Sequence, residues 1–130
     1  MSILDQTANE SPEEGGEMVK FERPGDAIVA QFKGRRTVKT KLQEAASVTR
    51  CLIVNSTIPN ITPGIKASIF EGTHVKQIMD DNNLQPGDGF VLRFHETVKR
   101  FKKFYFKKLT DEQLAEEAET KGVTLEAVPF

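Results

Sequence analysis

Apolar and polar residues alternate with a period of two along four stretches of the chain, and a fifth stretch, 48–55, is rich in β-branched residues, which together predict five β-strands. The stretches are 27–39, 48–55, 65–71, 90–95 and 101–109. Between the third and the fourth, the period changes to that of a helix, with Val75, Ile78 and Met79 on one side. The chain is therefore expected to form three strands, one helix and two further strands.

This order resembles the OB-fold, a five-stranded Greek-key barrel. The turn signals Pro24-Gly25-Asp26 and Pro86-Gly87-Asp88 precede the first and the fourth strand. Gly34 is expected to kink the long first strand, as a small barrel requires in order to close. We predict an all-β fold: a five-stranded OB-fold-like Greek-key barrel with one helix between strands 3 and 4, plus a C-terminal acidic helix and tail.

The same pattern predicts three segments. Residues 1–17 are polar and acidic and are expected to be disordered, residues 18–109 form the barrel domain, and residues 110–130 form an acidic helix and tail. Thr110 and Gln113 match a capping box that would begin the last helix. This helix could either pack on the barrel or stand free of it.

Charge is distributed very unevenly, although the net charge is only −1. In residues 1–26, seven acids against two bases give −5, and in residues 110–130 six acids against one base again give −5. The stretch 27–109 has fifteen bases and six acids, which gives +9. A basic body between acidic ends is typical of proteins that bind polyanions.

Residues 99–108 read KRFKKFYFKK, six cations and four aromatics. Cations attract phosphate and aromatic rings stack on unpaired bases, so this segment favours single-stranded nucleic acid. The alternative is an edge strand that lysines keep soluble. Alternation directs Phe104 and Phe106 to the core and Phe101 and Tyr105 to the other face. Tyr105 is then a stacking residue, unless it too belongs to the core.

The candidate nucleic-acid contacts come from strand 1 and its loop, from strands 2 and 3, and from the start of strand 5, which would converge on one side of such a barrel. They are Arg35, Arg36, Lys39, Lys41, Arg50, Lys66, Lys99, Arg100, Phe101, Lys103 and Tyr105.

Catalytic motifs are absent from the sequence. No His, Cys or Asp cluster has metal-ligand spacing, and there is no glycine-rich phosphate loop or nucleophile elbow. We expect a protein that is not an enzyme and needs no cofactor or metal. The lone Cys51 and the lack of a signal peptide or an apolar membrane span indicate a cytoplasmic location.

On these motifs, residues 18–109 resemble OB-fold single-stranded DNA-binding proteins, particularly the compact versions carried by phages and mobile elements. The chain end is also similar to the acidic tails of bacterial members, whose Pro-Phe tip is gripped by partner enzymes of replication and repair. The resemblance implies that Pro129 and Phe130 bind such partners, and that the tail competes with DNA for the basic groove. Only Glu126 is acidic next to this tip, whereas the family has a dense acidic run, and a terminal Phe also arises by chance.

The predicted function is to bind single-stranded nucleic acid, DNA rather than RNA, without strong sequence preference, during replication, recombination or repair. RNA remains open because stacking and phosphate contacts do not read the sugar. The alternative is an OB-like accessory or structural subunit whose basic face docks an acidic protein. A homo-oligomer is compatible with either function.

Overall fold

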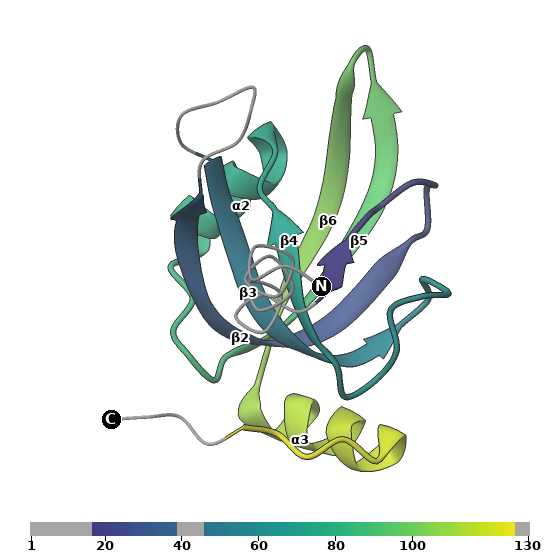
Figure 1. The fold of residues 1–130 in the computed structure, drawn as a ribbon, viewed down its shortest axis with the longest axis vertical. Coiled ribbons are helices and arrows are strands. Elements are labelled where there is room, and N and C mark those ends of the chain that lie inside the picture. Colours follow the sequence, from purple (N-terminus) through teal and green to yellow (C-terminus); the bar gives the residue numbers. More distant parts are fainter. Residues whose placement is uncertain (1–16, 39–45, 127–130) are drawn as a thin grey trace, which may run out of the picture.

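The computed structural model describes residues 17–38 and 46–126, which form six strands and two helices (Figure 1). The strands are β1 (Glu17–Val19), β2 (Ala27–Val38), β3 (Ala46–Ser56), β4 (Lys66–Phe70), β5 (Gly89–Val98) and β6 (Phe101–Leu109). The helices are α2 (Thr73–Asn82), between β4 and β5, and α3 (Asp111–Lys121), after β6.

The strands form one open sheet in the order β1-β4-β3-β2-β5-β6. The prediction of an all-β, five-stranded barrel is therefore wrong: the described residues form an α/β fold, a six-stranded mixed open sheet with two helices. The reason lies in β1, which pairs in parallel with β4 and takes the strand edge that a barrel would join to β6. A strand of three residues is too short to show an alternating pattern, so it was not predicted.

The core lies on one face of the curved sheet and follows the predicted alternation. Ile28, Ala30 and Phe32 of β2 are buried, and so are Phe90 and Leu92 of β5. The predicted kink at Gly34 is confirmed as a shift of register between β2 and β3 next to this glycine. Such a bulge bends a strand, and β2 pairs with β3 along one edge and with β5 along the other.

Helix α2 covers the core next to β6. Val75, Ile78 and Met79 are buried, as their helical spacing predicts. The backbone N–H of Phe104 in β6 donates a hydrogen bond of 2.9 Å to Nδ1 of His74. Because β6 is an edge strand, this bond satisfies a donor that would otherwise have no partner in the sheet.

Helix α3 packs on the other face of the sheet, as Figure 1 shows. Thr110 and Gln113 form the predicted capping box. Leu114 and Ala118 are buried in a second apolar cluster that includes Val54 of β3. A Cβ at Gly89 would come within 2.8 Å of the Leu114 side chain, so the close packing of α3 on β5 requires glycine at position 89. The acidic helix therefore belongs to the folded body and does not stand free.

Two turns of the same design precede β2 and β5. Oδ2 of Asp26 accepts the backbone N–H of Arg23 at 3.0 Å, and Oδ2 of Asp88 accepts that of Gln85 at 2.8 Å. The glycine before each aspartate has a φ of 99°, which glycine adopts readily. The hydrogen bond from Arg23 lowers the pKa of Asp26 below its ordinary value.

Candidate nucleic-acid interface

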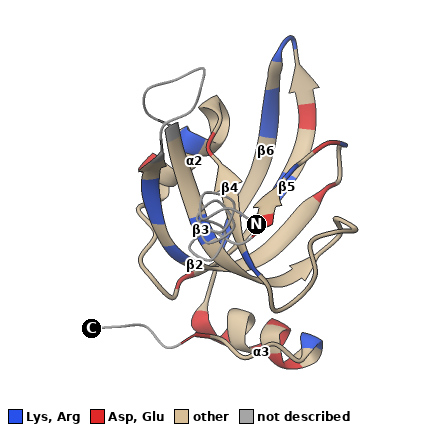
Figure 2. Ribbon diagram, viewed as in Figure 1, with Lys and Arg blue, Asp and Glu red and all other residues tan. Residues whose placement is uncertain are grey.

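The β5–β6 hairpin extends beyond the rest of the sheet and carries basic residues at its tip (Figures 1 and 2). Its turn contains only Lys99 and Arg100, because Val98 pairs directly with Phe101. Lys99 has a φ of 58°, a left-handed conformation that costs a lysine about 1 kcal/mol. The tight turn thus presents two cations at the end of a paired ribbon.

The two faces of β6 differ as the alternation predicts. Phe104 and Phe106 are partly buried and pack against the main core, whereas 59% of Phe101 and 46% of Tyr105 are exposed. On the outer face, the guanidinium of Arg93 lies 5.0 Å from the centre of the Tyr105 ring. Tyr105 therefore belongs to the surface and not to the core.

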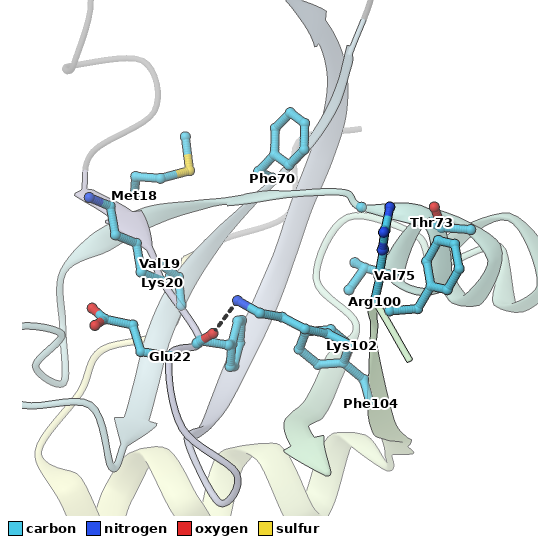
Figure 3. Close-up of a pocket in the computed structure, with 13 residues that line it drawn as sticks. Met18, Val19, Lys20, Glu22, Phe70, Thr73, Val75, Arg100, Lys102 and Phe104 are labelled. Carbon is cyan, nitrogen blue, oxygen red and sulfur yellow. Dashed lines mark hydrogen bonds between the residues drawn. The ribbon is translucent and has the colours of Figure 1, made fainter. Parts of the chain in front are cut away.

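A pocket of about 620 Å³ lies between β1, the junction of β4 with α2, and the start of β6 (Figure 3). It occupies the place where the open sheet leaves β6 without a partner strand. Residues from all three segments line it, including Met18, Lys20, Phe70, Arg100, Phe101 and Phe104. The pocket thus results from the pairing of β1 with β4, which leaves the sheet open instead of closed into a barrel.

Apolar surface is concentrated at this pocket. Among the described residues, the large hydrophobic side chains that are exposed are Met18, Phe70, Phe101 and Tyr105. The first three line the pocket, with exposed fractions of 42%, 45% and 59%. In Figure 3, Met18 and Phe70 lie along one side and Phe104 lies across from them. Exposed apolar side chains that gather in a hollow are typical of a binding site.

The charge at the pocket is positive. Lys20, Arg100 and Lys102 line it together with one acid, Glu22. Lys102 is anchored, because its Nζ donates a 2.7 Å hydrogen bond to the carbonyl of Phe21 (Figure 3). Within residues 17–38 and 46–126, no carboxylate forms an ion pair with Lys20, Lys99, Arg100 or Lys103. These four cations are available to a polyanion.

Arg35 has a different environment from these cations. Its guanidinium donates to both carboxylate oxygens of Glu71, and Nη1 donates to Oδ1 of Asp80 at 2.8 Å. The Glu71 side chain is fully buried and also accepts a 2.6 Å hydrogen bond from Thr49. The bonds with Glu71 raise the pKa of Arg35, and Arg35 followed by Lys76 lowers that of Asp80. Arg35 therefore supports the turn that follows Phe70.

Lys66 lies with Lys33 under the C-terminal segment. Glu126 forms ion pairs with Lys33 at 2.8 Å and Lys66 at 3.6 Å, and these lower its pKa, mainly through Lys33. The side-chain amide of Gln31 donates to the carbonyl of Glu126 and accepts from its N–H. The segment that ends at Glu126 is thus held on β2 and β4.

The predicted contact residues therefore fall into separate groups. The hairpin brings together Lys99, Arg100, Phe101, Lys103 and Tyr105. Arg35 and Arg36 lie on β2, and Arg50 lies on β3, where its Nε is buried without a hydrogen-bond partner in the described part of the chain. Lys39, Lys41, Pro129 and Phe130 lie outside the described residues.

Three residues that line the pocket, Met18, Lys20 and Phe70, are not among the contacts predicted from the sequence. The position of Phe70 in the sequence does indicate exposure. It follows Lys66 and Ser68 in the polar phase of its strand, so its aromatic side chain is expected to lie on the surface and not in the core. Met18 and Lys20 have no comparable indication in the sequence, because the alternating pattern does not predict β1.

Other kinds of site receive no support in the described residues. No group of three His, Cys, Asp or Glu side chains there could hold a metal ion. Cys51 is buried, and this burial raises the pKa of its thiol to about 12. No helix in the described part is long and apolar enough to span a membrane. Comparisons with protein-family models, with curated proteins and with solved structures give no match.

Proposed function

We propose that this protein binds single-stranded nucleic acid, DNA before RNA, at the pocket and the adjacent hairpin tip. Its role is to hold or present single strands during replication, recombination or repair, with little sequence preference. One observation carries this proposal: two exposed phenylalanines, Phe70 and Phe101, line one pocket beside cations that have no acidic partner among the described residues.

The chemistry of the pocket suits an unpaired base. Its volume of about 620 Å³ is in the usual range for small-molecule sites, so it has room for a base to enter. Each base that stacks on an aromatic ring contributes about 1–3 kcal/mol, whichever base it is. A duplex keeps its bases paired and stacked, so it cannot use Phe70 and Phe101 in this way.

The cations supply contacts to phosphate. Lys20, Lys99, Arg100 and Lys103 could each neutralise one phosphate. For single strands this number predicts that the logarithm of affinity falls with the logarithm of salt concentration at a slope of about −3. A backbone contact of this kind carries no sequence information, which agrees with general rather than specific binding.

The test is fluorescence anisotropy with labelled oligo-dT, oligo-U and a duplex of equal length, at about 50 and 200 mM salt. We expect oligo-dT to bind more tightly than the duplex. The variant Phe70→Ala/Phe101→Ala should lose about 5–150-fold in affinity per stacked base and keep its fold, because both rings are half-exposed. Lys121→Gln, on α3, is the control that removes a distant charge.

Absence of binding to all three probes at low salt would contradict the proposal. The pocket would then favour the second candidate, an accessory protein that docks an acidic partner. The observation behind that candidate is the same apolar pocket beside β1 and β6, the two edge strands of the sheet, where an extended acidic peptide could pair.

A further inference from the structure

The two acidic ends of this chain leave the folded body at different places. Residues 110–126 are part of the fold, because α3 is buried through Leu114 and Ala118 and the chain after α3 is held at Glu126. The N-terminal end joins the body at Glu17, where β1 begins. The next residue, Met18, already lines the pocket. Residues 1–16 are therefore tethered directly at the rim of the candidate site.

The composition of residues 1–16 complements the pocket. The segment contains four acids, Asp5, Glu10, Glu13 and Glu14, no lysine or arginine, and the apolar pair Ile3-Leu4. The pocket offers exposed Met18, Phe70 and Phe101 beside Lys20 and Arg100, which have no acidic partner among the described residues. Carboxylates can take the place of phosphates at these cations, and an apolar side chain can take the place of a base.

We propose that residues 1–16 occupy the pocket in the absence of nucleic acid and compete with it for the site. The competitive part of this inference rests on the proposed function, whereas occupancy of the pocket does not. Sixteen residues span up to about 50 Å when extended, so the segment is long enough to cross the pocket and reach the hairpin tip. A segment tethered this closely has an effective concentration near millimolar, so weak contacts suffice to fill the site.

The proposed competitor is thus the N-terminal acidic end and not the C-terminal one. The sequence resemblance implied that the tail 110–130 competes for the groove. In the structure, the acidic side chains of α3 belong to a helix packed on the other face of the sheet, and no described residue beyond Phe104 lines the pocket. An acidic segment that starts beside the pocket is better placed to compete.

Occupancy can be tested without any nucleic acid. Cys51 is buried and its thiol pKa is about 12, so Ser11→Cys in the full chain offers one reactive thiol for a nitroxide label. We expect the label to broaden the amide signals of Phe70, Arg100 and Phe101 but not that of Gln31. The matched variant adds Asp5→Asn, Glu10→Gln, Glu13→Gln and Glu14→Gln, and should lose most of this broadening. Equal broadening at Arg100 in the two proteins, or none, would overturn the proposal.

Competition is tested by oligo-dT anisotropy on the unlabelled full chain. At about 20 mM salt, neutralising the four acids should tighten binding by about three- to tenfold, and at about 300 mM the difference should disappear because the charges are screened. Equal affinities at low salt would overturn the competition. If neither protein binds oligo-dT while the broadening persists, occupancy stands and the proposed function fails.

Discussion

Arg35 and Arg100 are both arginines of the basic body, and both were candidate phosphate contacts, yet their surroundings differ completely. Arg35 contacts the buried carboxylate of Glu71 and also Asp80, and it joins β2 to the junction of β4 and α2. Arg100 lies in a two-residue turn at the hairpin tip and has no acidic partner in the described part of the chain. Local charge density alone therefore cannot separate cations that maintain the fold from those that can bind a ligand.

The difference between the two arginines has a physical origin. A buried carboxylate is very costly unless it is paired and hydrogen-bonded, so Glu71 requires a partner such as Arg35. A solvated arginine at a hairpin tip is not needed to neutralise a buried charge, so it can exchange its bound water for phosphate. The pocket depends on both arginines. Arg100 lines it directly. Arg35 acts through Glu71, which follows Phe70 in the chain and fixes the turn that presents the Phe70 ring.

The largest difference between the two arginines should appear in stability. Arg35→Ala leaves Glu71 buried without its ion pair and should lower the free energy of unfolding by about 2–3 kcal/mol, somewhat less than for a fully buried pair because Arg35 is partly exposed. Arg100→Ala should change it by less than about 0.5 kcal/mol. Urea denaturation of both variants measures this. Equal losses would show that the two arginines do not differ in role.

A smaller effect should appear in the titration of Asp80. Its pKa is lowered by hydrogen bonds from Arg35 and then Lys76, so its carboxylate contributes stability that is present above pH 3.8 and is lost as the pH falls through the lowered value. In Arg35→Ala, the pKa should rise towards 3.8. Asp26 is the internal control, because its pKa is lowered mainly by the backbone of Arg23. NMR titration of the side-chain carboxyl groups follows both residues, and an unchanged Asp80 would contradict the assigned ion pair.

Local patterns in the sequence were sufficient for much of the fold. The predicted strand 90–95 has Phe90, Leu92 and Phe94 in one phase, and all three are buried. Alternation also separated the inner face of β6 at Phe104 from the outer face at Tyr105. The capping box at Thr110 was recognisable because it lies within four consecutive residues. These features depend on neighbours along the chain, which a single sequence displays.

The remaining features depend on contacts between distant residues. The parallel pairing of β1 with β4 joins Val19 to Ile69, and it decided that the sheet is open. Arg35 and Glu71 lie 36 residues apart, so the residues around Arg35 in the sequence do not indicate this ion pair. The pocket could not be predicted either, since its lining comes from three segments that meet only in the folded chain.

Single strands are proposed to bind at the pocket and the hairpin tip, and amide chemical-shift mapping with unlabelled oligo-dT would locate the bound strand residue by residue. We predict that the signals of Lys20, Phe70, Arg100 and Phe101 shift on titration, whereas those around Lys33 on β2 stay unchanged. Shifts confined to the face around Lys33, with the pocket signals unaffected, would show that single strands bind elsewhere on the protein.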